Sequence, residues 1–572
     1  MTPNRLVLAI LMTTAAFAER PENSTAKNSK ISPEISRLKS GGPIDVIVRF
    51  KTDPSDGDRD DHHKKVTQLG GSYKRTHNII RAAAYRLNAE RIAELAKDDD
   101  VEYISLDHPM QTMATVNLDY FRETVGADAA ASAGWTGTGI GVAVIDSGVT
   151  AGADFATMAY QKSFVADPGT ADGYGHGTHV AGIIAGTGTN STGASGKYKF
   201  TGGAKGANII NLRALDANGS GSDSSVIAAI QEAVALKTAY NIRVINLSLG
   251  RPVTQSYLTD PLCQAVEAAW KAGIVVVVAA GNEGRNNSVG NNGYATILSP
   301  GNDPYVITVG AMRSKYTPNK SDDVAASYSS KGPTLVDHIV KPDLVAPGNL
   351  VISVEVPGSK LANKFPANSV PASLYMTQSA VALPHNYFTL SGTSMATPVV
   401  SAAVAAMLQK DPTLTPDVVK ARLMKTASKT FPTSSNSWDP ATHTVFTSYY
   451  DIFTIGAGYL DVNAALANYE TGTGNAISPT AVFNATTGGA TVTVNGLNVI
   501  WGTNVIWGTN VIWGTNVIWG TNVIWGTSGS WSSATPTASS VIWGSDTAAA
   551  SSVIWGTSEA AALTSLLGDD DQ

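Results

Sequence analysis

The stretch IVVVVAAGN occupies residues 274–282 and sets the pattern for the middle of the chain. Its near-continuous run of isoleucine and valine is typical of a strand that is buried on both faces. Three more short apolar runs follow the same pattern: GVAVID (141–146), RVINLSL (243–249) and YVITVGA (305–311). A set of such runs indicates a parallel sheet.

Helical segments separate these apolar runs. Two examples are SDSSVIAAIQEAVALKTAY at residues 222–240 and SMATPVVSAAVAAMLQKD at residues 394–411. Buried strands that alternate with amphipathic helices indicate an α/β fold. We therefore predict that residues from about 114 to 470 form a mostly parallel sheet with helices on both faces.

Four polar residues stand where such a fold collects functional groups, at the carboxyl ends of strands and the starts of helices. Asp146 ends the run GVAVID, and Asn282 follows IVVVVAAG. His176 opens the apolar segment HGTHVAGIIAG. Ser394 stands near a helix start, because Pro398 belongs in a first helical turn. Taken alone, each of these residues could equally be a turn or helix cap.

Taken together, the local sequences resemble the subtilisin-like serine proteases, or subtilases. Four motifs carry the resemblance, in the order Asp, His, Asn and Ser: GVAVIDSGV (141–149), DGYGHGTHVAGIIAG (172–186), AAGNEG (279–284) and SGTSMATP (391–398). The order Asp, His, Ser is the subtilisin order of a catalytic triad. The resemblance covers residues from about 114 to 470 and implies a serine endopeptidase.

The resemblance also implies a role for each motif residue. Ser394 would attack the scissile carbonyl, His176 would act as general base and then as general acid, and Asp146 would orient the imidazole. The Asn282 amide, with the backbone N–H of Ser394, would donate hydrogen bonds to the oxyanion. No cofactor is required for this chemistry.

Two short segments resemble the family's substrate-binding edges, where an extended peptide adds as a strand. These segments are Gly219, Ser220 and Gly221 in ALDANGSGS, and Ser248, Leu249 and Gly250 in NLSLG. Their glycines could instead be ordinary loop residues. A segment at residues 354–386, longer than in the shorter family members, is a candidate to line or shield the cleft.

Metal binding has weak support in the sequence. His176 and His179 are three residues apart, whereas helical zinc pairs prefer a spacing of four with a glutamate between them. We expect His179 to be packed or hydrogen-bonded within the helix. Asp154 and the loop GTGTNSTGASG (186–196) resemble calcium-site elements of the family, so structural calcium is a weak prediction.

The N-terminal region predicts secretion and processing. Residues 1–18 carry Arg5, an apolar run and a small-residue cleavage site, as a signal peptide does. Residues 19–113 resemble the family's inhibitory propeptide, with a small α+β domain at about 44–109 that acts as an intramolecular inhibitor. Self-cleavage between Met113 and Ala114 would place a methionine in the main specificity pocket. We therefore predict a preference for medium-sized apolar side chains.

The C-terminal part has a different composition. A linker is predicted at residues 471–497, Trp-containing hexapeptide repeats at 498–557 and an acidic end at 558–572. The motif NVIWGT occurs five times from Asn498 to Thr527. Eight tryptophans are separated from one another by multiples of six residues, so an extended strand would present them on one face. Attachment to a surface, to polysaccharide or to other copies is one interpretation, and recent duplication without function is the other.

Composition excludes several classes of protein. A net charge of −6 over 572 residues gives no indication of nucleic-acid binding. The single cysteine, Cys263, excludes a disulfide framework and is expected to be buried packing. An esterase is disfavoured because it would need an acid and then a histidine after the serine, and only His443, in a polar loop, follows Ser394. A catalytically idle scaffold of an adhesive or matrix protein is the second alternative.

Overall fold

The computed structural model describes most of the chain between residues 30 and 493. The described residues are 30–32, 35, 42–52, 54, 61–107, 119–152, 154–155, 158–191, 198–288, 290–375, 386–429, 434–439, 444–471, 474–484, 489–493 and 554–555. The predicted signal peptide, Met113–Ala114 and nearly all of the repeats lie outside these residues. The chain divides into two compact units, Met1–Thr115 and Val116–Gln572.

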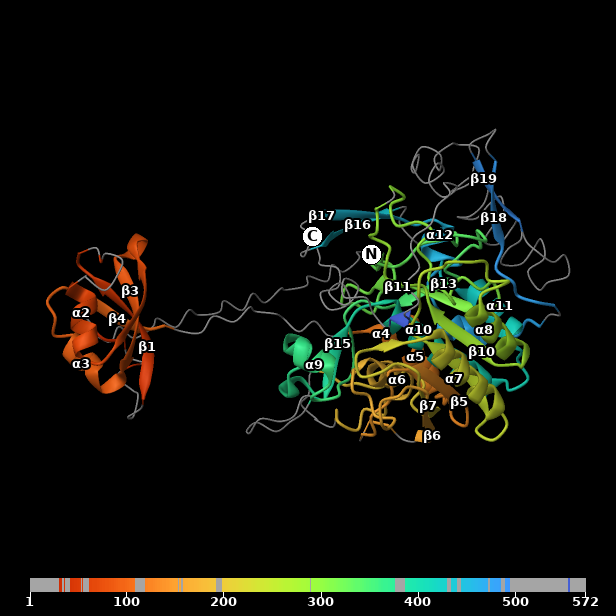
Figure 1. Cartoon of the computed structure of the whole chain (residues 1–572), viewed down its shortest axis with the longest axis horizontal. Helices are drawn as coiled ribbons and strands as arrows, with labels where there is room; N and C mark the ends of the chain where they lie inside the picture. Colours follow the sequence, from red (N-terminus) through yellow and green to blue (C-terminus); the bar gives the residue numbers. More distant parts are fainter. Residues whose placement is uncertain are drawn as a thin grey trace, which may run out of the picture. The chain divides into compact units, whose positions relative to one another are not determined.

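The first unit is a four-stranded antiparallel sheet in the order β2-β3-β1-β4, with helices α2 and α3 packed on it (Figure 1). Val48 and Phe50 of the sheet share a core with Val66 and Leu95 of the helices. The elements are β1 (Pro43–Phe50), α2 (Asp61–Gln68), β2 (Ser72–His77), η1 (Asn78–Ile80), β3 (Ala82–Asn88), η2 (Ala89–Arg91), α3 (Ile92–Leu95) and β4 (Val101–Leu106).

One strand of this unit has no apolar signal in the sequence. Strand β2 reads SYKRTH, lies at the edge of the sheet and has no fully buried residue. An edge strand has a paired neighbour on one side only, and charged side chains are common there.

The second unit is built on an eight-stranded sheet in the order β12-β11-β10-β9-β5-β7-β6, with β13 added beside β11. All neighbours in this sheet are parallel except β11 and β12. Every residue of Val275–Ala279 is buried, so both faces of the sheet are covered. The predicted α/β fold is therefore confirmed. The strands are β5 (Gly141–Asp146), β6 (Met158–Ser163), β7 (Asn208–Arg213), β9 (Ile242–Leu247), β10 (Val275–Ala279), β11 (Ile307–Arg313), β12 (Val324–Ala325) and β13 (Leu344–Pro347).

Two pairs of helices cover this sheet (Figure 1). The long helix α10 packs on α6 and on strands β9, β10 and β11, whereas α7 packs on α8. Cys263 of α8 is buried and donates from Sγ to Asn302 Oδ1 at 3.3 Å, as expected of a packing residue. The helices are α4 (Phe121–Val125), α5 (Ala127–Ser132), α6 (His176–Ala185), α7 (Asp223–Ala235), α8 (Pro261–Lys271), α9 (Lys360–Lys364), η3 (Pro366–Asn368), η4 (Ala372–Leu374), α10 (Thr393–Lys410), α11 (Pro416–Thr426), α12 (Ile452–Ile455) and α13 (Val462–Ala467).

Four antiparallel strand pairs complete the second unit. They are β14 (Val351–Val354) with β15 (Tyr387–Leu390), β16 (Ser434–Asp439) with β17 (Thr444–Tyr449), β18 (Thr480–Asn484) with β19 (Gly489–Thr493), and β8 (Ser220–Gly221) with β20 (Ile554–Trp555). Among the helices that the structure describes, none has both the length and the apolar character needed to cross a bilayer.

Part of the predicted linker at residues 471–497 packs on the second unit. Ala476 and Ala481 are buried in the core of the second unit. Ser478 Oγ donates to Asp343 Oδ1 at 2.5 Å, and the Pro479 carbonyl accepts from Val340 N at 2.8 Å. Small residues are typical of linkers, but they also allow close packing on a domain surface.

Candidate active site

Asp146 is the last residue of β5 and is fully buried. Its Oδ1 accepts hydrogen bonds from Ser147 N at 2.7 Å and from Ser147 Oγ at 3.2 Å. The same oxygen lies 2.8 Å from His176 Nδ1. A buried carboxylate is costly unless it is hydrogen-bonded, and these donors fix Asp146 at the carboxyl edge of the sheet.

His176 is the first residue of α6 and is also buried. A Cβ on the next residue, Gly177, would lie 2.2 Å from the Gly148 carbonyl oxygen, so only glycine allows the helix start to approach the turn after β5. This close approach brings His176 Nδ1 to the Asp146 carboxylate. His176 Nε2 has no hydrogen-bond partner among the described residues.

The surroundings of His176 favour its protonated form. Burial lowers the pKa of the imidazole, but the charge and hydrogen bond of Asp146 and the charge of Asp172 raise it, and the net pKa is raised above the usual value of 6.5. The nearby negative charges therefore outweigh desolvation. An imidazole held in this way is stabilised when it takes up a proton.

Asp172 supports the turn that carries Asp146 and His176. Its Oδ1 accepts from Ser147 Oγ at 2.8 Å and from Gly175 N at 2.7 Å, and its Oδ2 accepts from Thr178 N at 2.8 Å. Burial raises the pKa of this carboxyl. The role of Asp172 in holding the turn depends on contacts that no spacing in the sequence reveals.

Ser394 is the second residue of α10 and is buried, and its Oγ lies 3.2 Å from the Ser248 carbonyl oxygen. Pro398 lies in the second turn of the helix, not in the first as predicted. Because proline has no N–H, the carbonyl of Ser394 loses its usual helical partner. The Ser248 hydroxyl replaces that partner and donates to the Ser394 carbonyl at 2.8 Å.

Asn282 lies three residues beyond the end of β10. Its Oδ1 accepts from Thr393 N at 2.9 Å and from Thr393 Oγ1 at 3.1 Å. With the amide oxygen held by the residue before Ser394, the NH₂ group remains as the donor end of the side chain. Thr393 is a positioning residue that the motif alone did not single out.

The first candidate substrate edge contains strand β8. Its preceding residue Gly219 has a φ of +76°, and a Cβ there would lie 2.7 Å from the Tyr174 ring. The Tyr174 and His176 rings have centroids 6.5 Å apart. This edge therefore ends beside the candidate base.

The second candidate edge follows β9 and adjoins Ser394. Ser248 and Leu249 are buried, and Ser248 makes the two contacts with Ser394 described above. The residue after Gly250, Arg251, pairs with Ser299 in an isolated bridge. Ser248–Gly250 is therefore held both at Ser394 and at its far end.

The long segment at 354–386 reaches the loop that precedes His176. Lys360 N donates to the Gly173 carbonyl and Leu361 N to the Tyr174 carbonyl, each at 3.0 Å. Lys360 Nζ donates to Asn218 Oδ1 at 3.0 Å. This segment thus lies next to both Tyr174 and the first candidate edge.

Two metal candidates remain, His179 and Asp154. His179 is buried and hydrogen-bonded through Nε2 to the Phe388 carbonyl at 3.0 Å, and burial lowers its pKa to about 3, as expected of a packed histidine. The carboxylate of Asp154 accepts from Asn190 N and Asn190 Nδ2 at 2.9 and 3.1 Å. Within the described residues, no three His, Cys, Asp or Glu side chains are placed to hold a metal ion. Structural calcium at Asp154 stays a prediction.

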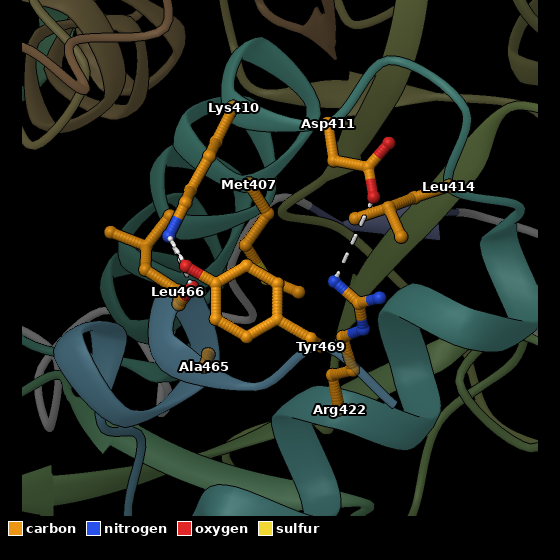
Figure 2. A pocket seen from close by; sticks show the side chains of 8 residues that line it. All are labelled: Met407, Lys410, Asp411, Leu414, Arg422, Ala465, Leu466 and Tyr469. Carbon is orange, nitrogen blue, oxygen red and sulfur yellow. Dashed lines mark hydrogen bonds and ion pairs between the residues drawn. The ribbon is translucent and has the colours of Figure 1, made fainter. Parts of the chain in front are cut away.

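A pocket of about 180 Å³ lies at the other end of α10 from Ser394 (Figure 2). Its lining is Met407, Lys410, Asp411, Leu414, Arg422, Ala465, Leu466 and Tyr469. At 1.5 Å per residue, the helix separates Ser394 from Lys410 by about 24 Å. This pocket therefore belongs to a different part of the molecule from the candidate site.

Comparison with known sequences identifies the class. The sequence model described as the Subtilase family matches residues 137–446, which is more than half of the chain. The chain belongs to the subtilase family and is a serine-type endopeptidase.

Individual relatives support this assignment. Serine protease AprX of Bacillus subtilis (strain 168) is 39% identical over 310 residues, which cover 51% of this chain and 62% of that protein, less than two thirds of its length. Subtilisin E of the same organism is 33% identical over 392 residues, covering 68% of this chain and 87% of that protein. An extracellular serine proteinase of Thermus sp. (strain Rt41A) is 33% identical over 370 residues, covering 63% and 74%.

Proposed function

We propose that this chain is a secreted endopeptidase that cleaves proteins through an acyl-enzyme. In this proposal Ser394 is the nucleophile, His176 the general base and acid, and Asp146 the group that orients the imidazole. The observation that carries the proposal is the buried 2.8 Å contact between His176 Nδ1 and Asp146 Oδ1. It leaves Nε2 as the nitrogen that exchanges protons with the nucleophile.

The proposed reaction needs only protein groups and water. Ser394 Oγ attacks the peptide carbonyl carbon while its proton passes to His176 Nε2. The Asn282 amide and the Ser394 N–H donate to the oxyanion that forms. Collapse of the tetrahedral intermediate breaks the C–N bond, and His176 gives its proton to the leaving amine. Water, deprotonated by His176, then hydrolyses the ester and restores the Ser394 hydroxyl.

The two candidate edges would hold the substrate as an added strand. Ser220–Gly221 is a short strand whose edge accepts an antiparallel partner. Main-chain pairing there and along Ser248–Gly250 would give affinity that depends little on side chains. Selectivity would then come from the pocket next to the scissile bond, where Met113 predicts a medium-sized apolar residue. A peptide library that favoured Arg or Asp at that position would contradict this preference.

Maturation by self-cleavage is part of the proposal. Residues 19–113 would inhibit the enzyme until the bond between Met113 and Ala114 is cut, after removal of residues 1–18 as a signal peptide. Intact mass and N-terminal sequencing of the exported protein, beside a Ser394→Ala variant, test this directly. We expect wild type to begin at or near Ala114 and the variant to keep its propeptide.

The opposite result has a defined meaning. If both proteins keep residues 19–113, self-cleavage is excluded, and an added protease can be used to remove the propeptide. Hydrolysis of an unstructured protein by wild type, but not by Ser394→Ala, would then still support the proposed catalytic triad. No hydrolysis by either protein would favour the idle-scaffold alternative. The fate of residues 498–557 is read from the same mass spectra.

A further inference from the structure

The C-terminal tail contributes a strand to the first candidate substrate edge. Strand β20 pairs antiparallel with β8, with Ile554 opposite Gly221 and Trp555 opposite Ser220. These two strands form a sheet of their own among the described strands. The tail therefore adds a strand where the proposed function places the peptide substrate.

The direction of β20 is that of a chain running towards the candidate active site. From Ile554 to Trp555 the strand passes from Gly221 to Ser220, towards the Gly219 end of the edge. Gly219 lies against Tyr174, which is next to His176. A peptide with the orientation of β20 thus has its carboxyl side towards the catalytic residues.

The sequence at β20 is one copy of a repeated motif. VIWG occurs seven times, and the copy at residues 553–556 contains β20. Val, Ile and Trp favour extended backbone. No Lys or Arg follows Lys429, so the copies carry no positive charge to distinguish them. Each copy therefore offers the same residues for strand pairing with Ser220–Gly221, the edge with which Ile554 and Trp555 pair.

We infer that the VIWG copies are internal ligands of the substrate-binding edge and compete with peptide substrates. The inference rests on the proposed use of Gly219–Gly221 for substrate pairing. Covalent attachment makes this binding intramolecular, with an effective concentration of about millimolar order. Because a short strand pair binds weakly, the tail raises the apparent KM for a short peptide by about two- to tenfold and leaves kcat unchanged.

The first test breaks the backbone pairing in every copy of the full-length, propeptide-free chain. Proline removes a backbone N–H, so one variant replaces the isoleucine of all seven copies: Ile500, Ile506, Ile512, Ile518, Ile524, Ile542 and Ile554. A matched control places one proline just before each of the seven VIWG copies. The replaced residues are Asn498, Asn504, Asn510, Asn516, Asn522, Ser540 and Ser552. We expect KM to fall two- to tenfold in the first variant only. Equal KM values in wild type and both variants, or equal falls in both variants, would overturn the inference.

Intact mass before and after each assay ensures that the rates come from chains that keep the tail. Cleavage within the VIWG copies by wild type, but not by Ser394→Ala, would show that the edge binds them as substrates, which supports the binding. The peptide SSVIWGTS, added to the isoleucine variant, should inhibit competitively, whereas SSVPWGTS should not. Equal inhibition by both peptides would reject strand pairing.

The second test separates this inference from the proposed function. If no variant hydrolyses any peptide, the proposed function fails, and calorimetric binding of SSVIWGTS to the isoleucine variant still decides the inference. Binding of that peptide but not of SSVPWGTS supports an internal ligand. Absence of binding, or self-association through the repeats seen by light scattering without competition, overturns it.

Discussion

The two ends of helix α10 differ in what surrounds them. At its start, Ser394 is buried and Thr393 holds the Asn282 amide, while Ser248 contacts both the hydroxyl and the carbonyl of Ser394. At its end, Lys410 Nζ donates to the Leu466 carbonyl and the Tyr469 hydroxyl, beside a pocket of about 180 Å³ (Figure 2). The end of the helix has the hollow, whereas the start of the helix has a network of buried hydrogen bonds. Partnership between buried polar groups therefore marks the candidate site better than shape does.

The largest effect is expected within the candidate site, on removing the Asp146 charge. Asp146→Asn leaves His176 without its carboxylate partner, and we expect kcat/KM to fall by about 10⁴-fold. In the proposed mechanism only neutral His176 accepts the Ser394 proton, so activity should rise as pH passes upward through the pKa of His176. In wild type this rise should be centred above 6.5, because the pKa of His176 is raised. In the variant it should move to lower pH, because burial remains while the attracting charge is gone.

A carboxylate at the other end of the helix provides the control for this prediction. Asp411 follows the last residue of α10 and faces Arg422 at 4.0 Å. Asp411→Asn should leave both kcat/KM and its pH profile unchanged. A shift of the profile in this variant equal to that in Asp146→Asn would mean that the pH dependence does not report His176.

Removal of the Asn282 amide should have the next largest effect. Asn282→Ala should lower kcat by about 10²- to 10³-fold with little change in KM, a magnitude known for subtilisin. Thr393→Val removes one of the hydrogen bonds that orient the amide but keeps the donor itself, so its loss should be below about tenfold. Equal losses in the two variants would indicate that Asn282 acts on packing and not on the oxyanion.

A smaller effect is expected on stability from Ser248. Ser248→Ala leaves the Ser394 carbonyl buried without its donor, which should lower the free energy of unfolding by about 1–3 kcal/mol. Urea unfolding in a Ser394→Ala background measures this without self-digestion. Pro398→Ala restores a helical N–H for that carbonyl and should recover part of the loss. If the two substitutions change the free energy of unfolding additively, the Ser248 hydroxyl does not replace the N–H that Pro398 lacks.

The smallest effect is expected at the pocket in Figure 2. Lys410→Ala should change kcat/KM by less than about twofold and stability by less than about 1 kcal/mol, because the lost contacts lie at the protein surface. A large loss of activity in this variant would contradict the distinction between the two helix ends, because it would make the pocket part of the functional site.

The sequence predicted the residues with local signals but not the contacts between distant segments. Asp146, His176, Asn282 and Ser394 stand at strand ends and helix starts, which apolar periodicity and family motifs both indicate. The Ser248 hydroxyl bonds a carbonyl 146 residues away, and no local pattern reports that distance.

Buried charge shows the same limit. Lys420, in the helical stretch PDVVKARLMKT, reads as a solvent-exposed residue of α11 but is fully buried. Its Nζ lies 3.2 Å from Asp343 Oδ1, which belongs to a different segment. The packing of Ala476 and Ala481 also has no distinct signal in the sequence, because small residues suit both linkers and tight contacts.

In the proposed mechanism, the contact between Ser248 and Ser394 couples substrate binding to the alignment of the nucleophile. Ser248 belongs to the second candidate edge, and it also contacts the hydroxyl and carbonyl of the residue proposed to attack. A peptide long enough to pair with that edge would hold the same backbone that holds the nucleophile. Binding energy from substrate residues remote from the scissile bond can then stabilise the orientation of the nucleophile. Shortening a substrate from that side should therefore lower its turnover rate more than its affinity.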